Sequence, residues 1–248
     1  MTEPLRPALA AVTFLTRVPL GRRIQVEADD IARGAWLFPV VGGAVGGGAG
    51  LLADLTASWV PSLAAGAIAI GAAALATGAM HLDALADTFD ALGASTRERA
   101  LEIMRDHAIG AFGVTALVVV CIVDASLLGA LAQTHDAALV GLAAGAAGRA
   151  AMLPPALAFP YARSGEGQGR ALARLSVVAT ALGVVIAAVL ALPAGFAGVA
   201  ALAAAAVVTA LAILFFDRRF GGVTGDVLGA TGKLAETGAL LVGAAVVL

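Results

Sequence analysis

Residues 175–216 read LSVVATALGVVIAAVLALPAGFAGVAALAAAAVVTALAILFF and contain no Asp, Glu, Lys or Arg in 42 consecutive positions. A membrane-spanning helix needs about 20 mostly apolar residues, so this stretch is long enough for two spans. The sequence Leu192-Pro193-Ala194-Gly195 interrupts it with two strong turn formers. We therefore expect spans over about 175–192 and 196–216, joined by a tight turn.

The composition of the whole chain agrees with this membrane character. Of 248 residues, 60% are hydrophobic and 13% are charged, and the mean hydropathy is +0.97. Soluble domains carry about 25% charged residues, so this chain has too little polar surface to stay in solution. The formal net charge of −2 gives no sign of a polyanionic partner. These values exclude a soluble enzyme, a disordered chain and a basic nucleic-acid-binding protein.

Further apolar stretches extend the bundle on the N-terminal side. The turn 58–62 separates two of them, and the tail 237–248 is too short to cross unless its helix begins earlier. Besides the two spans above, we expect spans at about 36–58, 62–80, 113–132 and 137–158, and a short interfacial helix over 3–16. The sequence thus predicts an all-α, polytopic membrane bundle of six to seven spans, forming one domain over 1–248.

The positive charges predict how this bundle is oriented. If residues 1–35 face the cytoplasm and the spans alternate, the polar segments 81–112, 160–174 and 217–236 face it too. These four regions contain 14 of the 15 Lys and Arg residues, and the fifteenth, Arg149, lies within a span. Such an excess marks the cytoplasmic side of a membrane protein. We expect the functional site in the polar segments on that side.

Three aspartates in the segment 81–112 form the most informative polar pattern. Asp83, Asp87 and Asp90 are spaced i, i+4 and i+7, so they share one stripe of a helix. Residues 81–96 include no Lys or Arg to offset their mutual repulsion. A hard divalent cation, Mg²⁺ or Mn²⁺, would offset it and prefers oxygen ligands. A solvated acidic face and a proton or cation pathway are the alternatives.

A second polar group follows in the same segment. Glu102 and Asp106 are four residues apart and share a helix face with Arg105. Carboxylates beside an arginine fit a site that binds both a metal ion and phosphate, because the guanidinium fork matches phosphate oxygens. An ordinary ion-pair face on a helix would produce the same pattern.

Two further residues stand out, one at the end of a span and one inside a span. Asp226 lies among the glycines of the stretch 221–230, where the backbone can approach a ligand closely, although a structural loop aspartate is the simpler reading. Arg149 lies within a span and is expected to face a polar cavity or to form a buried ion pair. Acidic and basic groups gathered on one side of the bundle together favour metal-assisted phosphoryl transfer.

Five sequence motifs, in order along almost the whole chain, resemble the cobalamin synthase (adenosylcobinamide-GDP ribazoletransferase) family. They are FLTRVP (14–19), HLDALADTFD (81–90), LEIMRD (101–106) with GAFG (110–113), PYAR (160–163) with the glycines of 165–169, and GVTGDVLGA (222–230). Ala84 and Ala91 stand where the family usually has glycine, and His107 stands where it commonly has serine.

The resemblance implies a Mg²⁺-dependent enzyme of the bacterial inner membrane, with Mn²⁺ as a substitute. It would join adenosylcobinamide-GDP to α-ribazole, or to its 5′-phosphate, and release GMP. The implied catalytic residues are Asp83, Asp87, Asp90, Asp106 and Asp226. The implied metal ligands are Asp83, Asp87, Asp90, Glu102 and Asp106. The implied phosphate- and substrate-binding residues are Arg17, Arg105, Arg149, Arg163 and His81. The partners implied are these two substrates and the lipid bilayer, and a homo-oligomer is left open.

Two other functions compete with this one. A CDP-alcohol-type membrane phosphotransferase also uses spaced helical aspartates with Mg²⁺, but its Asp-Gly-x-x-Ala-Arg signature is absent, since Asp87 follows Ala86 where arginine should stand. A small ion or solute transporter should place ionisable residues near mid-membrane in two related halves. Here nearly all of them lie at one end of the predicted spans, and no repeat is evident.

Overall fold

A computed structural model describes residues 5–18, 26–106, 108–163 and 168–248. The long helices are α3 (Phe38–Thr56), α4 (Ser62–Thr77), α5 (Met80–Leu92), α7 (Ala111–Leu131), α8 (Ala137–Ala150), α10 (Val177–Ala191), α11 (Gly195–Phe220) and α12 (Gly225–Val247). The short elements are α1 (Arg6–Leu15), α2 (Ala28–Gly34), α6 (Arg97–Ile103), α9 (Leu153–Ala158) and the 3₁₀ turns η3 (Ala35–Leu37), η4 (Gln168–Arg174) and η5 (Leu192–Ala194). The described residues include no strand, only an isolated bridge between Tyr161 and Val223. The all-α prediction is confirmed.

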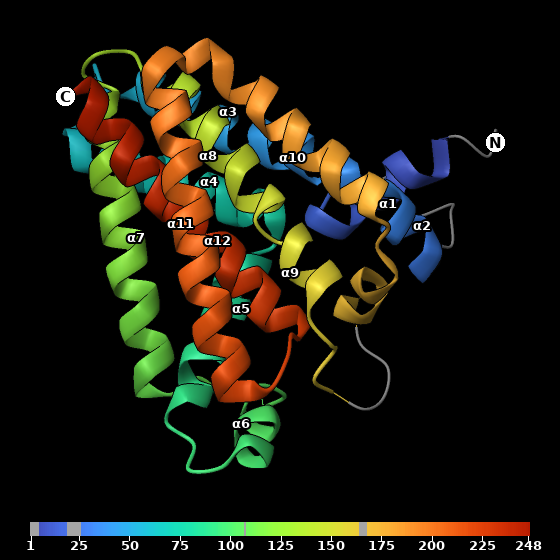
Figure 1. The fold of residues 1–248 in the computed structure, drawn as a ribbon. Helices are drawn as coiled ribbons and strands as arrows, with labels where there is room; N and C mark the ends of the chain where they lie inside the picture. The colour runs from blue at the N-terminus through green and yellow to red at the C-terminus, as the bar shows by residue number, and fades with distance from the viewer. Residues whose placement is uncertain (1–4, 19–25, 107, 164–167) are drawn as a thin grey trace.

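The spanning helices confirm a polytopic membrane bundle (Figure 1). By length and composition, five helical stretches can cross a membrane, or six if the bent pair α4 and α5 forms one span. The five are Ala28–Thr56, Ala111–Leu131, Ala137–Ala158, Val177–Phe220 and Gly225–Val247. The stretch Val177–Phe220 breaks at η5, as Pro193 and Gly195 predict, and Gly195 has a positive φ of 58°.

The C-terminal part differs from the sequence-based prediction. A polar loop over 217–236 was expected, but α11 continues to Phe220 and α12 begins at Gly225. The loop is therefore limited to 221–224, and Lys233 lies inside a spanning helix. This helix can carry the charge because Lys233 is buried against acidic partners instead of facing lipid. The early helix start also makes the apolar tail long enough to cross.

Helices α3 and α8 pack closely against each other through their glycines. A methyl group added to Gly46 would lie 2.2 Å from the carbonyl oxygen of Gly141, and one added to Gly42 would lie 2.3 Å from that of Gly145. Small residues let helices approach closely where lipid provides no hydrophobic drive for their association. This contact buries most of α8, including Arg149 near its C-terminal end.

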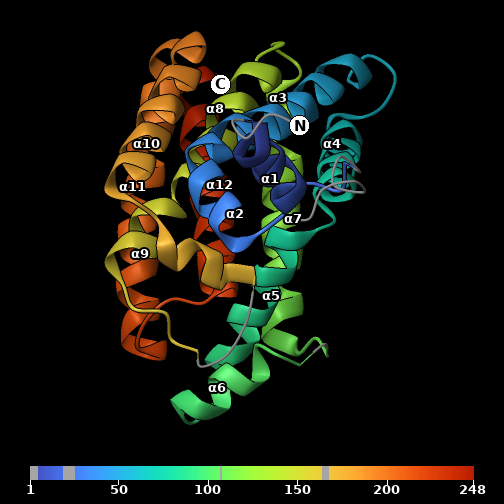
Figure 2. The same cartoon turned by 90° about the vertical axis from the view of Figure 1, so that its right-hand side faces the viewer.

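A sharp bend between α4 and α5 directs α5 toward the polar end of the bundle. The two helices meet at 93°, and both residues between them, Gly78 and Ala79, have left-handed backbone angles with φ of 64° and 58°. Arg17 packs against Gly78, and its backbone N–H donates to the carbonyl of Ala76 at 2.7 Å. The bend places α5 against α7 and α12, with α6 at the end farthest from the C-terminus (Figure 2).

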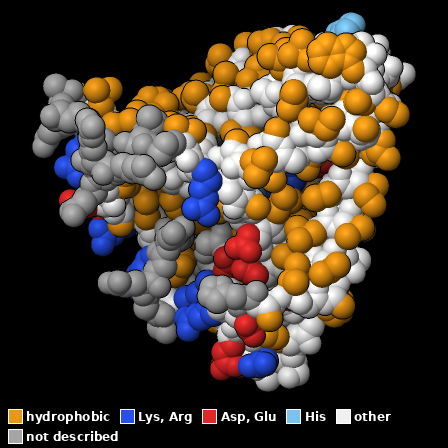
Figure 3. Space-filling view, turned by 180° about the vertical axis from the view of Figure 1, so that it is seen from behind, with side chains coloured by type: hydrophobic (Ala, Val, Ile, Leu, Met, Phe, Trp, Pro, Cys, Tyr) orange, Lys and Arg blue, Asp and Glu red, His pale blue; other side chains and the backbone are white. Residues whose placement is uncertain are grey.

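Polar and apolar side chains are separated on the surface. Figure 3 shows hydrophobic side chains over the upper part of the molecule and acidic and basic side chains gathered lower on the same face. Exposed large apolar residues occur on the outer sides of the long helices, for example Val185 of α10 and Leu211 of α11. These surfaces suit contact with lipid, and the polar end suits contact with water-soluble substrates.

Candidate active site

The candidate site is a cavity of about 270 Å³ between α1, α5, α12, η4 and the segment 160–163. Its polar lining includes His81, Asp83, Tyr161, Arg163 and Asp226. Three segments that are far apart in sequence, 81–112, 160–174 and 217–236, thus contribute to one cavity. The three segments that were predicted to carry the site therefore meet in the structure, and their catalytic role stays a prediction.

The glycine-rich loop before α12 fixes the position of Asp226. Val223 donates its backbone N–H to Pro160 at 2.9 Å, and its carbonyl accepts the N–H of Ala162 at 2.8 Å. Gly222 has a φ of 139°, and a methyl group there would lie 2.3 Å from the carbonyl oxygen of Pro160, so only glycine fits. These contacts hold the loop beside the segment 160–163.

Thr224 then begins α12. Its hydroxyl accepts the backbone N–H of Val227 at 3.1 Å, which is a standard N-cap. Asp226 lies in the first turn, where its carboxylate forms an ion pair with Arg163 at 2.6 Å. The loop and the cap together place this pair in the wall of the cavity.

The cavity carries an excess of negative charge. Asp83 and Asp226 line it, while Asp87 on α5 is not part of the lining but experiences the negative charges of Asp83, Asp226 and Asp90 and the positive charge of Arg163. The single guanidinium therefore offsets only part of the acidic charge, and a cation would offset more of it. Burial raises the pKa of the Tyr161 hydroxyl, so this phenol stays protonated at neutral pH and can donate a hydrogen bond.

Asp90 makes structural contacts. One carboxylate oxygen accepts the backbone N–H of Gly110 at 2.7 Å, and the other accepts that of Gly113 at 2.8 Å. The side chain thus binds the N-terminal N–H groups of α7, which a helix leaves without internal partners. A methyl group at either glycine would lie within 2.5 Å of an Asp90 oxygen, which explains why glycine stands at both positions. The catalytic and metal-binding roles expected of Asp90 stay predictions.

The second predicted cluster lies outside the lining of the cavity. On α6, Glu102 pairs with Arg99 at 2.9 Å, and both side chains are more than 60% exposed. This is the ordinary ion-pair face that was left open as an alternative. Just after α6, the Asp106 carboxylate accepts the N–H of Ala108 at 3.2 Å. Arg105 does not line the cavity either, and His107 lies outside the described residues.

The remaining predicted residues divide between the cavity and its surroundings. His81 is 3% exposed, lines the cavity and has no hydrogen-bond partner for either ring nitrogen among the described residues. Arg17 lies at the bend after α4 and does not contribute to the lining. Arg149 forms a buried ion pair with Glu236, which is the second of the two alternatives stated for it.

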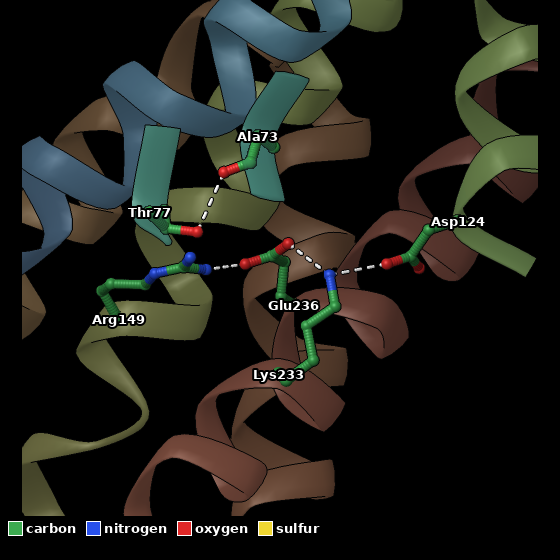
Figure 4. Close-up of polar contacts among 6 residues, drawn as sticks. All are labelled: Ala73, Thr77, Asp124, Arg149, Lys233 and Glu236. Carbon is green, nitrogen blue, oxygen red and sulfur yellow. Dashed lines mark hydrogen bonds and ion pairs between the residues drawn. The ribbon is translucent and has the colours of Figure 1, made fainter. Parts of the chain in front are cut away.

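Sequence reasoning missed a buried charge network behind the cavity (Figure 4). Lys233 places its Nζ 2.6 Å from Asp124 and 2.6 Å from Glu236, and Glu236 pairs with Arg149. These side chains and His81 line a smaller space of about 50 Å³ that adjoins the site through His81. The signal available was Asp124, an acid in the middle of the apolar stretch 113–132.

The donor types in the cavity fit a hard divalent cation. No three His, Cys, Asp or Glu side chains among the described residues are placed to hold a metal ion by themselves. Mg²⁺, however, usually keeps several waters and is bound through one or two carboxylates together with substrate phosphates. Asp83 of α5 and Asp226 of α12 both line the cavity and supply carboxylates of this kind, and Asp226 pairs with Arg163, whose guanidinium suits phosphate.

Comparisons with known proteins identify the family of the chain. The family model described as cobalamin-5-phosphate synthase matches residues 7–244. The adenosylcobinamide-GDP ribazoletransferase of Brucella ovis is 39% identical, with 94% of each chain covered. The protein of the same name from Acetivibrio thermocellus is 35% identical, covering 94% of this chain and 95% of its own. No solved structure matches the chain significantly.

These matches confirm the resemblance stated from the motifs, and they favour the transferase prediction over the CDP-alcohol and transporter alternatives. The region matched by the family model, residues 7–244, includes every residue that lines the cavity, from Phe14 of α1 to Gly229 of α12. The chain is a membrane transferase, and it belongs to the cobalamin-5-phosphate synthase family.

Proposed function

We propose that this enzyme joins adenosylcobinamide-GDP to α-ribazole, or to its 5′-phosphate, and releases GMP. The printed names of the relatives and the family model support the class of reaction. The observation that carries the proposal is the Arg163–Asp226 ion pair in the same cavity as Asp83. A guanidinium that can bind phosphate beside carboxylates that can bind a metal ion is a set of groups that phosphoryl-transfer enzymes commonly use.

Mg²⁺ would be held by Asp83, Asp87 and Asp226 together with phosphate oxygens of the substrate. When bound, it would reduce the negative charge on the pyrophosphate and on the departing GMP. Asp87, Glu102 and Asp106 all lie outside the cavity lining, but Asp87 interacts electrostatically with Asp83 and Asp226, whereas any part of Glu102 and Asp106 in metal binding stays a prediction.

The chain's own residues would bind and orient the two substrates. Arg163 would exchange part of its pairing with Asp226 for the phosphate oxygens, which match its donors. The Tyr161 hydroxyl, being protonated, would donate to the same phosphates. Holding the acceptor hydroxyl and the phosphorus in one small cavity lowers the entropic cost of their encounter.

The proposed reaction involves the following bond changes. An oxygen of the acceptor attacks the phosphorus attached to the cobinamide arm, a new P–O bond forms, and the P–O bond to GMP breaks. The proton of the attacking hydroxyl passes to a carboxylate of the cavity, and the departing GMP carries the negative charge.

We also propose that the enzyme lies in the bacterial inner membrane with the cavity facing the cytoplasm. With Lys233 and Arg149 both inside spans, the other 13 of the 15 Lys and Arg residues all belong to the sequence segments 1–35, 81–112, 160–174 and 217–224. This excess is the pattern expected of cytoplasmic segments.

The direct test is a product assay with protein purified in lipid nanodiscs. Incubation with adenosylcobinamide-GDP, Mg²⁺ and α-ribazole or its 5′-phosphate should yield GMP and a joined corrinoid product in equal amounts. A reaction without acceptor is the control for simple hydrolysis. Folded protein that forms neither product with either acceptor would overturn the proposal.

A further inference from the structure

A groove between α1, α3 and α4 is separate from the site cavity and shares no residue with its lining. It has a volume of about 490 Å³. Val18 and Val40 in its wall are 46% and 41% exposed, so the groove presents free apolar surface to a ligand. Residues along its length include Val12, Thr16, Val18, Val40, Gly48 and Ala76. The Thr16 hydroxyl already donates to the Val12 carbonyl at 2.7 Å, so the described lining has no unused side-chain donor.

We propose that this groove binds an acyl chain of a membrane phospholipid with an anionic headgroup, and that Arg17 binds the phosphate of that lipid. Arg17 was expected to bind a substrate phosphate, but it does not line the site cavity. The proposed reaction makes no use of the groove, so this inference does not depend on the proposed function.

The groove has the direction and depth of an acyl chain. Val40 lies in the first turn of α3, and Gly48 follows about two turns later, which is about 12 Å along the helix. Arg33, the last charged residue before α3, precedes Val40 by seven positions, so the Val40 end of the groove is its polar end. One leaflet contributes about 15 Å to the hydrocarbon core of a bilayer. The groove therefore extends from near the membrane interface through most of one leaflet.

Arg17 lies at the polar end of the groove. Its neighbours in the chain, Thr16 and Val18, both line the groove. Its backbone N–H donates at 2.7 Å to the carbonyl of Ala76, another lining residue, and its exposed side chain packs against Gly78 just beyond α4. Within the described part of the chain, no carboxylate pairs with this guanidinium. A guanidinium without an acidic partner suits a phosphate diester, whose oxygens match its donors.

A phospholipid fits this combination better than a soluble ligand does. A soluble molecule carries polar groups along its length, and the apolar groove would leave them without partners. An acyl chain has none, and its flexibility lets it follow walls of small residues such as Ala44, Gly48 and Ala72. Phospholipids also surround a spanning helix at high local concentration, so mass action favours their binding.

The bound lipid would support one wall of the site cavity. Helix α1 has ten residues, which is too short for a stable helix without tertiary contacts. Val12 and Thr16 of α1 line the groove, whereas Phe14 of the same helix lines the site cavity. An acyl chain against α1 would therefore stabilise the position in which this helix contributes to the site.

The test measures thermal unfolding of the full chain in a neutral maltoside detergent, after removal of lipid and with one lipid added back. Dioleoylphosphatidylglycerol, which is anionic, should raise the melting temperature by about 5 °C at saturation. Dioleoylphosphatidylcholine has the same chains and no net charge, and should raise it less than half as much. Native mass spectrometry should show one phosphatidylglycerol retained per chain.

Two glycines provide a matched pair of variants for the groove. A methyl group added at Gly48 or at Gly71 meets no atom within 4 Å, but only Gly48 lines the groove. Gly48→Leu should fill the groove and abolish both the retained lipid and the rise in melting temperature. Gly71→Leu should keep both. Without lipid, the two variants should unfold within about 2 °C of each other, because neither leucine displaces protein atoms.

Three arginine variants test the headgroup contact. Arg17→Gln should reduce the response to phosphatidylglycerol to that seen with phosphatidylcholine, and Arg17→Lys, which keeps the charge, should retain at least half of the difference. The matched control is Arg33→Gln, which removes an exposed arginine of α2 outside the groove and should leave the difference unchanged.

Each result supports or overturns one part of the proposal. Lipid retention and stabilisation that survive in Gly48→Leu would overturn the groove as the binding site. Equal responses of the wild type to the two lipids would overturn the anionic headgroup. An equal loss of the difference in Arg17→Gln and Arg33→Gln would indicate general charge attraction and overturn the role of Arg17. None of these measurements uses GMP release, so failure of the proposed function would be seen separately.

Discussion

Lys233 on α12 places its ammonium nitrogen 2.6 Å from a carboxylate oxygen of Asp124 on α7, and both side chains are buried within spanning helices. Glu236 and Arg149 complete a set of two acids and two bases, which is neutral as a whole. Buried charges in a membrane protein are tolerated when they are paired in this way. The network joins α7, α8 and α12 directly behind the site.

Breaking this network should destabilise the fold strongly. Lys233→Met leaves Asp124 as a buried charge without its main partner, which costs about 3–5 kcal/mol in comparable pairs. Thermal unfolding in nanodiscs measures the loss. The matched control is Arg99→Gln, which breaks the exposed pair with Glu102 and should cost at most about 1 kcal/mol. Equal losses in the two variants would contradict a special role for the buried pair.

Asp83 and Asp90 should respond differently to the same substitution. Asp83→Asn removes a charge from the cavity and should lower GMP release by at least about 100-fold with little change in stability, because charge stabilisation at the reacting group is a large catalytic factor. Asp90→Asn weakens the contacts with Gly110 and Gly113 and should cost about 1 kcal/mol of stability. Steady-state kinetics and thermal unfolding of both variants provide the comparison. An Asp83→Asn variant within tenfold of wild-type turnover would argue against the site.

Activity should require a divalent cation. After EDTA treatment and desalting, GMP release should be lost, and Mg²⁺ or Mn²⁺ should restore it because carboxylate oxygens suit both ions. Unfolding before and after treatment shows whether the protein stays intact without metal. Full activity in the chelated protein would contradict the metal prediction for Asp83, Asp87 and Asp226.

Alanine substitutions at two nearby glycines of α3 should differ in their effect on stability, because only one of the glycines contacts α8. A methyl group at Gly46 meets the backbone of Gly141, whereas one at Gly48 meets nothing within 4 Å. Gly46→Ala should therefore lower the melting temperature by several degrees, since backbone must move, and Gly48→Ala should leave it unchanged. A Gly48→Ala variant that is as unstable as Gly46→Ala would show that the loss reflects glycine flexibility and not packing.

The orientation of α7 can be tested by labelling. This helix has 21 residues and is about 30 Å long; the exposed Gln133 follows its C-terminal end, and the exposed Glu98 lies on α6, which precedes its N-terminal end in the chain. In a Cys121→Ala background, Gln133→Cys should react with an impermeant maleimide in intact spheroplasts. Glu98→Cys should react only after lysis. The reverse pattern would place the cavity on the outer side.

The spanning segments could be predicted from the chain alone because partition between lipid and water depends on local composition. Residues 175–216 had to span, and Pro193 and Gly195 had to divide them, whatever the other helices do. The spacing of Asp83 and Asp87 likewise predicted a shared helix face. The start of α12 was not predictable in this way. The charge of Lys233 favoured a polar loop over 217–236, and only the tertiary structure shows that Asp124 pairs with this charge inside the bundle.

Which polar groups meet was decided only by the tertiary structure. The sequence determined that Asp90, Glu102 and Asp226 were polar groups at one end of a membrane bundle and that Arg149 lay within a span, but not which of them face each other. The bend at Gly78 and Ala79 and the packing of α8 against α3 direct Asp83 and Asp226 to one cavity, Asp90 to the start of α7, and Arg149 to Glu236. Ion pairing and hydrogen bonding act over a few ångströms between distant segments, so the partners depend on helix packing and not on local spacing.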